Sequence, residues 1–185
     1  MKVLIACEFS GIVRDAFAKG GHDTLSCDLL PTEKPGNHYQ GDVTEILKEK
    51  WDLMIAHPPC TYLCNSGVRW LYSQPGRWLK MEDASKFFML LYTANIPKIC
   101  IENPIPHRHA NLPPYTQIIQ PYMFGHGETK ATCLWLKNLP LLKPTNEVKG
   151  RKPRVHYESP GIDRWKNRSR TYTGIATAMA EQWGM

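Results

Sequence analysis

A cysteine preceded by two prolines is the residue in this sequence best placed to do chemistry. Residues 57–64 read His-Pro-Pro-Cys-Thr-Tyr-Leu-Cys and follow directly after the apolar run 53–56. The prolines fix φ and remove two backbone donors, so the chain leaves the predicted strand in one rigid direction. Cys60 should therefore lie at the carboxyl end of a buried strand, where parallel sheets bind their ligands. A thiol in that position is a candidate nucleophile.

A carboxylate follows a second predicted strand in the same way. The apolar run 99–101 ends in Glu102-Asn103-Pro104. Because the carboxyl ends of parallel strands meet at one edge of a sheet, the Cys60 thiol and the Glu102 carboxylate should share that edge.

The spacing of apolar residues predicts an α/β chain with alternating strands and helices. Strands are expected at 2–7, 24–27, 52–56, 98–101, 117–124 and 131–136, and helices at 11–19 (with Ser10 as its cap), 43–50, 82–95 and 175–183. Alternating βα units imply a doubly wound, mostly parallel sheet with helices on both faces. At 185 residues, 1–185 should form a single domain with a substantial core.

The cysteines indicate a reducing environment. Six are present, and four of them (Cys7, Cys27, Cys100 and Cys133) lie in or beside apolar runs, where a thiol usually behaves as a small core hydrophobe. With no secretory signal and no apolar stretch of transmembrane length, we expect a cytoplasmic protein without disulfides and without membrane contact.

The net charge of +6 comes from one segment. Residues 143–170 carry nine basic and three acidic side chains, whereas the rest of the chain is balanced. This asymmetry predicts a polyanionic partner such as nucleic acid. A solvated basic surface loop is the alternative interpretation.

The turn after the first predicted strand is where a nucleotide-like cofactor would dock. Here it reads Cys-Glu-Phe-Ser-Gly, with one glycine and no full G-x-G-x-x-G, so a pyrophosphate is not expected. Asp28, which ends the second strand, is placed for ribose hydroxyls, and Asp42 for an adenine edge. Taken singly, each of these acids is also a common capping or turn residue.

Together, these motifs resemble the S-adenosylmethionine-dependent cytosine-5 methyltransferases that act on DNA. Pro58-Pro59-Cys60 resembles the catalytic motif of the family and Glu102-Asn103 its catalytic pair. The resemblance implies a Rossmann-like methyltransferase fold with S-adenosylmethionine as cofactor. It also implies a set of cofactor-binding residues: Glu8, Phe9, Ser10, Gly11, Asp28, Asp42, Pro58, Thr173 and Gly174.

Methylation at carbon 5 of cytosine needs these residue types. Carbon 5 is a poor nucleophile until a thiolate adds to carbon 6, and Cys60 would supply that thiolate. Negative charge then moves toward ring nitrogen 3, so Glu102 is expected to have a raised pKa and to act as a proton donor. A cation must favour the thiolate, and Lys130 lies where the family carries a basic residue. A surface lysine is the alternative for Lys130.

Two departures from the family pattern concern recognition of the substrate. Only about forty residues separate Leu136 from Thr173, which leaves little room for a sequence-reading region. The family's Gln-x-Arg-x-Arg signature is absent, and 127–132 stand in its place. The resemblance is therefore to a compact member without a large recognition domain, for which a separate recognition subunit is conceivable.

Substrate contacts are expected from aromatic and basic side chains in the loop after Cys60 and from the basic segment. Such residues suit phosphates and unstacked bases, although aromatic side chains also pack under long loops. The expected set is Pro59, Asn103, Arg69, Trp70, Arg77, Arg164, Lys166, Arg168 and Arg170.

Two other functions are compatible with these residues. His57, Cys60 and Cys64 could ligate zinc as in cytosine deaminases, but the spacing differs from the deaminase signature and no metal is expected. A non-catalytic protein that binds nucleic acid or cofactor is the other possibility. The sequence also leaves open whether the substrate is DNA, RNA or a free nucleotide.

Overall fold

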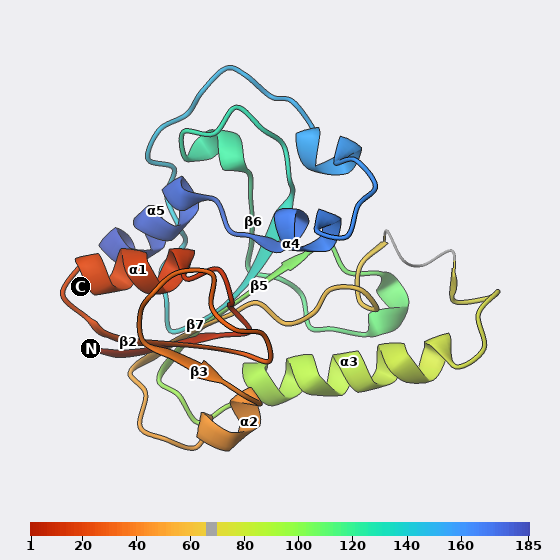
Figure 1. The fold of residues 1–185 in the computed structure, drawn as a ribbon, viewed down its shortest axis with the longest axis horizontal. Coiled ribbons are helices and arrows are strands. Elements are labelled where there is room, and N and C mark those ends of the chain that lie inside the picture. Colours follow the sequence, from red (N-terminus) through yellow and green to blue (C-terminus); the bar gives the residue numbers. More distant parts are fainter. Residues whose placement is uncertain (66–69) are drawn as a thin grey trace.

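The chain folds around one seven-stranded sheet (Figure 1). The computed structural model describes residues 1–65 and 70–185. The strand order is β3-β2-β1-β4-β5-β7-β6. The strands are β1 (Lys2–Ala6), β2 (Asp23–Asp28), β3 (His38–Gln40), β4 (Leu53–Ala56), β5 (Lys98–Pro104), β6 (Gln117–Ile119) and β7 (Thr132–Lys137).

Five neighbouring strands are parallel, and the last two complete a mixed sheet. β1 pairs in parallel with β2 and β4, β2 with β3, and β4 with β5, whereas β7 is antiparallel to both β5 and β6. The order reverses between β1 and β4, because the chain first builds outward to β3 and then returns. The predicted α/β class with a mostly parallel sheet is confirmed, and β1 and β4 form the switch point at which such sheets bind ligands.

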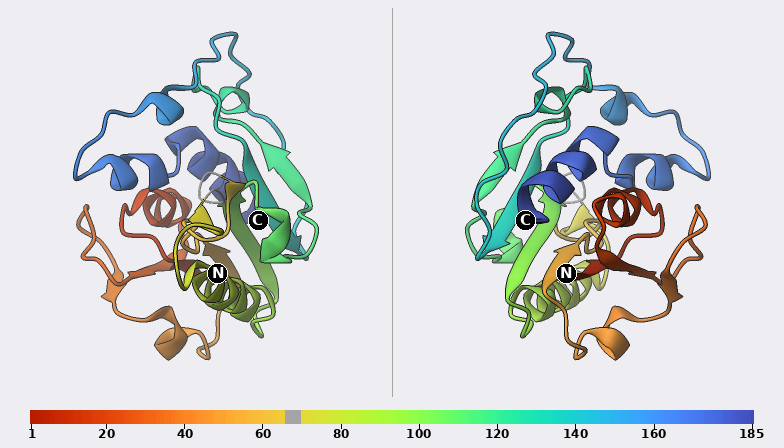
Figure 2. Two further views of the ribbon diagram at one scale, coloured as in Figure 1. Left: turned by 90° about the vertical axis from the view of Figure 1, so that its right-hand side faces the viewer. Right: turned by 90° about the vertical axis from the view of Figure 1, so that its left-hand side faces the viewer.

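Helices cover both faces of the sheet, as the two end-on views in Figure 2 show. The helices are α1 (Ile12–Lys19), α2 (Val43–Ile46), α3 (Arg77–Tyr92), α4 (Arg164–Ser169) and α5 (Thr173–Trp183). Leu4 and Met54 face the layer of α2 and α3, whereas Val3 and Ile55 face the layer of α1 and α5. Because side chains alternate along a strand, near-continuous apolar runs fill both layers.

Several boundaries differ from the sequence-based expectation. α3 begins at Arg77 rather than at 82, because Gly76 adopts a left-handed conformation (φ 72°) directly before it. The expected strand 117–124 ends at Ile119 and continues as a 3-10 helix, Pro121–Met123. β3 and α4 were not expected. Both are short, and β3 has only three residues, too few to show a period.

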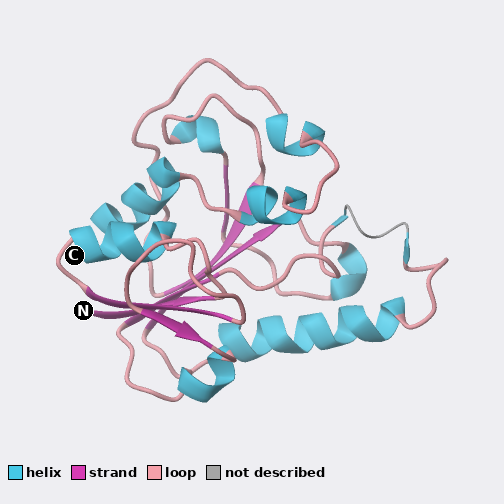
Figure 3. Ribbon diagram, in the orientation of Figure 1, coloured by secondary structure: helices cyan, strands magenta, loops and turns pink. Residues whose placement is uncertain are grey.

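Much of the chain between β5 and α5 is loop, as Figure 3 shows. It contains two further 3-10 helices, Arg108–Ala110 and Arg154–Tyr157. All six cysteines are free thiols. Within residues 1–65 and 70–185, no helix has the length and apolar character to span a membrane.

Candidate active site

A cavity of about 120 Å³ lies at the carboxyl ends of β1, β4 and β5. Its wall comes from residues 7–10 after β1, 57–60 after β4 and 102–104 at the end of β5, with Lys130 and residues 168–171 completing it. The structure thus brings Cys60, Glu102, Asn103 and Lys130 together, although they are far apart in the sequence. Pro58 and Pro59 line the same cavity.

The Glu102 carboxylate forms a buried ion pair with His57. The distance between Glu102 Oε2 and His57 Nδ1 is 2.8 Å, and the two side chains are only 10% and 11% exposed. Three rigid features hold the pair. Glu102 lies within β5, the backbone N–H of His57 donates to the carbonyl of Ala6, and Pro58 follows directly.

This ion pair corrects the expected protonation of Glu102. Burial by itself would raise the pKa of Glu102, but the hydrogen bond from His57 and the charges of His57 and Lys130 outweigh it, and the pKa is lowered from its ordinary value. For His57, burial would lower the pKa, but the hydrogen bond and charge of Glu102 raise it. Both shifts favour the combination of carboxylate and imidazolium, and the pKa of Glu102 is lowered rather than raised as the sequence suggested.

Cys60 is a neutral thiol at rest. A hydrogen bond with Cys64 and burial raise the pKa of Cys60 well above its ordinary value. The two residues lie on one turn, with the N–H of Cys64 donating to the carbonyl of Cys60. The positive charge of Lys130 acts in the opposite direction, which puts the predicted cation close to the sulfur. Thiolate formation therefore requires the Cys60–Cys64 contact to weaken.

Asn103 presents an acceptor at this site. Its Nδ2 donates to the carbonyl of Pro58 at 2.8 Å, which fixes the orientation of the amide. Its Oδ1 is buried and has no hydrogen-bond partner among the described residues, and the same is true of His57 Nε2. Buried polar atoms are nearly always paired in folded proteins. Two unpaired ones in the wall of one cavity indicate a place for a polar ligand.

The turn after β1 has a largely structural role. The Glu8 carboxylate accepts the N–H groups of Val13 at 2.7 Å and Arg14 at 3.2 Å, so it caps α1. Ser10, the expected cap, adds only a 3.3 Å bond from the N–H of Ile12. A Cβ on Gly11 would lie 2.5 Å from the guanidinium of Arg14. Glu8 and Gly11 thus stabilise the helix start, and Glu8, Phe9 and Ser10 line the cavity.

Acids end the next two strands, as expected for a cofactor with hydroxyl and amino groups. Asp28 closes β2 and Asp42 follows β3; each accepts a backbone N–H of its own turn. Burial raises the pKa of the Cys7 thiol, and the charges of Asp28 and Asp42 raise it further, so both carboxylates are near Cys7. Cys7 has a φ of 58°; it packs against the core, as the sequence suggested, and also lines the cavity. Carboxylate acceptors at this edge fit an adenosine-like group.

The C-terminal turn contributes different residues from those expected. Thr173 and Gly174 pack against the loop after β6, where the N–H of Gly174 donates to His126 Nε2 at 3.0 Å. Thr171, two residues earlier, lines the cavity instead and hydrogen-bonds Glu102. Sequence analysis missed Thr171 and the pairing role of His57. A signal for His57 was its position directly before Pro-Pro-Cys.

The basic segment is less free to bind a polyanion than its composition suggested. Arg170 pairs with Glu33 at 2.6 Å, Lys166 with Asp163 at 3.9 Å, and the Nε of Arg164 is buried. Arg168 lines the cavity. The Trp165 ring lies 5.9 Å from the Phe9 ring, so α4 packs over the turn after β1.

The expected substrate contacts in the loop after Cys60 are partly engaged within the chain. Arg77 belongs to the first turn of α3; it donates to the carbonyl of Thr61 at 3.1 Å, and its guanidinium lies 4.6 Å from the Tyr62 ring centroid. Trp70 is partly exposed (38%). Arg69 lies outside the described residues.

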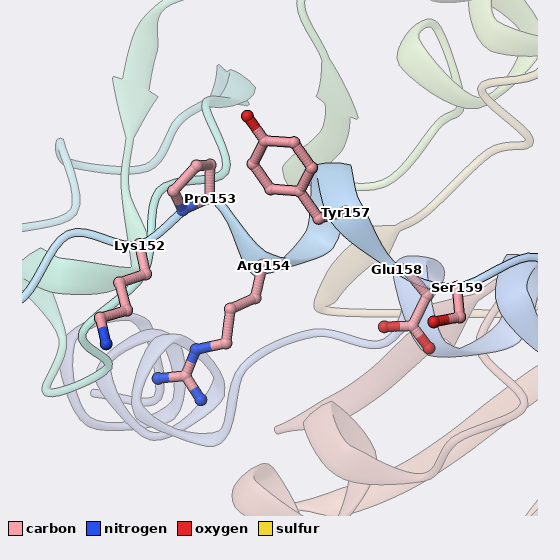
Figure 4. A pocket seen from close by; sticks show the side chains of 6 residues that line it. All are labelled: Lys152, Pro153, Arg154, Tyr157, Glu158 and Ser159. Atoms are coloured by element: carbon pink, nitrogen blue, oxygen red, sulfur yellow. The ribbon is translucent and has the colours of Figure 1, made fainter.

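A second, larger cavity lies in the basic segment and has fewer reactive side chains in its wall. It has a volume of about 520 Å³ and is lined by Lys152, Pro153, Arg154, Tyr157, Glu158 and Ser159 (Figure 4). Figure 4 shows Lys152 and Arg154 extending to one side of the segment and the Tyr157 ring to the other. It has no thiol and no pair of catalytic groups, so the smaller cavity is the candidate active site.

The described part of the chain has no set of side chains that could bind a zinc ion. Across residues 1–65 and 70–185, no group of three or more His, Cys, Asp or Glu side chains is arranged to hold a metal ion. His57 Nδ1, one of the nitrogens that a metal would need, is hydrogen-bonded to Glu102.

Comparison with solved structures shows a methyltransferase fold. A prophage-encoded E. coli protein described as a DNA modification methyltransferase matches with a TM-score of 0.51 and 16% identity, over 88% of this chain and 56% of that one. A methyltransferase of Entamoeba histolytica, EhMeth, gives 0.48 and 13% over 88% and 61%. The S. pombe Dnmt2 methyltransferase gives 0.43 and 15% over 93% and 55%.

At these identities the similarity concerns the fold. The chain spans between 55% and 61% of the length of these three structures. No protein-family model and no curated protein matches the sequence.

Proposed function

We propose that the protein transfers a methyl group from S-adenosylmethionine to carbon 5 of cytosine, with DNA as the substrate and Cys60 as the nucleophile. The observation that carries this proposal is the convergence of Cys60, Glu102, Asn103 and Lys130 on one cavity at the switch point of a methyltransferase fold. A thiol beside a cation and a hydrogen-bonding carboxylate is the set of groups that addition to a pyrimidine ring requires.

The cofactor would be held on the β1–β3 side of the sheet edge. Asp28 and Asp42 would accept hydrogen bonds from ribose hydroxyls and from the adenine amino group, and Phe9 and Ser10 would contact the cofactor from the cavity wall. When bound there, S-adenosylmethionine supplies the electrophilic methyl group. The chain's own residues hold the cytosine, carry the proton and exclude water.

The enzyme's part of the reaction centres on Cys60. Lys130 favours the thiolate, whose sulfur adds to carbon 6 of the ring. Asn103 Oδ1 faces no acceptor or donor of the described chain and would take a hydrogen bond from the exocyclic amino group of cytosine. Pro58 and Pro59 hold the thiol in place while the base enters.

Substrate recognition would come mainly from the backbone of the nucleic acid. Arg168, which lines the cavity, is the cation of the basic segment best placed to contact a phosphate beside the target base. The short segment between β7 and α5 leaves target selection to shape and backbone or to a separate recognition subunit.

A non-catalytic binding protein is the second candidate, and one observation favours it. The hydrogen bond that the Cys60 thiol donates to Cys64, together with burial, favours the neutral form of Cys60, which is unsuited to nucleophilic attack. Such a protein would use the same cavity to bind cofactor or a base without reaction.

Mass spectrometry of nucleosides separates the two candidates. DNA and RNA are incubated with the protein and methyl-labelled S-adenosylmethionine, digested, and searched for labelled methylcytosine. We expect labelled 5-methyldeoxycytidine from DNA, and none with the Cys60→Ser variant. Cofactor binding without label in any nucleoside would support the non-catalytic candidate. Label found in RNA or in free nucleotides, and not in DNA, would show that DNA is not the substrate.

A further inference from the structure

We propose that His57, rather than Glu102, gives the proton to ring nitrogen 3 of cytosine, with Glu102 serving as its counter-ion. This proposal rests on the proposed function, because it assigns a role in cytosine methylation. It adds a catalytic residue, and it changes the role of the carboxylate from proton donor to partner of the donor.

The geometry places His57 for this role. It precedes the nucleophile by three residues, and the two intervening prolines make the connection rigid. Nδ1 is bound to Glu102 at 2.8 Å, so the ring cannot turn without breaking that bond. Nε2 is buried, has no partner among the described residues, and belongs to a residue that lines the cavity with Cys60. One ring nitrogen is therefore anchored and the other is left to meet a ligand.

Donor and acceptor requirements then decide between the two groups. Glu102 as a carboxylate can only accept hydrogen bonds, so it cannot donate to a ring nitrogen. With Nδ1–H directed at Glu102, a protonated His57 presents Nε2–H as a donor. Nitrogen 3 of cytosine is an acceptor, and it needs such a donor more as negative charge reaches it.

The neighbouring Asn103 makes the pattern selective for cytosine. The Nδ2 atom of Asn103 is bound to Pro58, so its unpaired Oδ1 is an acceptor. A donor at His57 and an acceptor at Asn103 match nitrogen 3 and the amino group of cytosine. Uracil reverses both positions, with N3–H and a carbonyl oxygen, and would leave both protein groups mispaired.

The addition step balances with this assignment. Cys60 first loses its proton to solvent. Its sulfur then forms a bond to carbon 6. The π electrons of the 5,6 double bond form a 4,5 double bond, and the π electrons of the double bond between carbon 4 and nitrogen 3 move to nitrogen 3. The proton on His57 Nε2 moves to nitrogen 3 and leaves a neutral imidazole, still hydrogen-bonded to Glu102. After methyl transfer, solvent water removes the proton from carbon 5, the electrons of that C–H bond re-form the 5,6 double bond as the sulfur leaves, and the proton on nitrogen 3 returns to His57.

The charged groups around His57 favour its protonated form on balance. Glu102 on β5 and Glu8 after β1 favour the imidazolium, whereas Lys130 before β7 opposes it. Asp28 at the end of β2 also interacts with the charge on His57. Loss of the Glu102 charge should therefore make His57 easier to deprotonate, so that His57 loses its proton at lower pH.

The test compares the pH dependence of methyl transfer in the parent, H57Q and E102Q. Both variants keep a side chain able to hydrogen-bond the remaining partner, so neither leaves a buried charge without any partner. The single-turnover rate is measured with labelled S-adenosylmethionine and a cytosine-containing polynucleotide. In the parent, loss of the imidazolium proton should bend the profile of log rate against pH downward. This bend should be absent in H57Q and should move to lower pH in E102Q, with a rate loss of about 10²-fold for H57Q at the parent's optimum.

Opposite behaviour of the two variants would overturn the assignment. If the bend persists in H57Q and disappears in E102Q, Glu102 is the proton donor and His57 only positions it. If H57Q keeps the parent's rate and profile, nitrogen 3 receives its proton elsewhere. Absence of labelled methylcytosine from the parent at every pH would instead refute the proposed function, and with it this role for His57.

Discussion

Two neighbours of Cys60 shift its pKa in opposite directions. The hydrogen bond with Cys64 and burial favour the thiol, whereas Lys130 favours the thiolate. Since the thiolate is the reactive form of cysteine, the reactivity of Cys60 should depend on the balance between these contacts.

Removal of the Cys64 contact should make Cys60 more reactive. In Cys64→Ala, the pKa of Cys60 should fall toward its ordinary value, and alkylation of Cys60 by iodoacetamide at pH 8 should be faster than in the parent. In Lys130→Ala the alkylation of Cys60 should be slower than in the parent, because a positive charge that lowers the pKa of Cys60 is lost. Mass spectrometry of the peptide containing Cys60 follows the reaction. Equal rates in the parent and in Cys64→Ala would show that Cys64 does not control the thiol.

The residue types at this site could be predicted from the sequence, but their protonation could not. Cys60 and Glu102 follow strands whose apolar runs are easy to recognise. The ion pair of Glu102 with His57 joins residues 45 positions apart, and it reverses the direction of the pKa shift expected for a buried carboxyl group. The pKa of a buried group depends on its partner, and a single sequence does not show which residue that partner is.

At the scale of elements, α5 is fixed by a close contact with the loop after β6. Gly174, in its first turn, approaches the carbonyl of Phe124 so closely that a Cβ would overlap the oxygen. Thr171, which lines the cavity, is three residues earlier. The close packing of Gly174 thus fixes the start of α5, three residues after a residue of the cavity wall.

A methyl group at Gly174 should therefore destabilise the protein. For Gly174→Ala we expect the free energy of unfolding to fall by about 1–3 kcal/mol, as for other overpacked sites. Gly161→Ala is the matched control, because a Cβ there meets no atom within 4 Å; its effect should be within about 0.5 kcal/mol. Urea denaturation measures both. A neutral Gly174→Ala would mean that α5 shifts freely against the loop.

The long elements could be predicted from the sequence, whereas the short elements β3 and α4 could not. β1, β4 and β5 are apolar on both faces, because helices cover both sides of the sheet. β3 pairs three residues with β2, and α4 has six residues without a side-chain cap, so neither shows a clear local pattern. Tertiary contacts such as the pair of Arg170 with Glu33 place these elements.

At the scale of the whole molecule, one end of the basic segment lines the candidate active site, and the positive charge of the segment is only partly available. Arg151 pairs with Glu147 at 3.0 Å and lies over the Tyr122 ring, whereas Arg168 lines the candidate active-site cavity. Across the part of the chain that the structure describes, no acidic side chain forms an ion pair with Arg168. Binding of a nucleic-acid backbone should therefore depend on particular cations rather than on the total charge.

The salt dependence of DNA binding should distinguish these cations. If Arg168 contacts a phosphate, Arg168→Ala should lower the slope of log affinity against log salt by about one. Arg151→Ala removes the same charge at a site away from the cavity and should change the slope much less. Fluorescence anisotropy with a labelled oligonucleotide gives both slopes. Equal changes for the two variants would indicate a diffuse charge effect without a contact at the cavity.

The bond between the Cys60 sulfur and carbon 6 of cytosine is the central step of the proposed reaction, and trapping it is the most direct test. An oligonucleotide that carries 5-fluorocytosine is incubated with the protein and S-adenosylmethionine; because fluorine cannot leave as a proton does, the bond between Cys60 and carbon 6 should persist through denaturation. We expect a stable protein–oligonucleotide complex with the parent and with Cys64→Ser, and none with Cys60→Ser. A complex that survives in Cys60→Ser, or none with the parent, would contradict nucleophilic catalysis by Cys60.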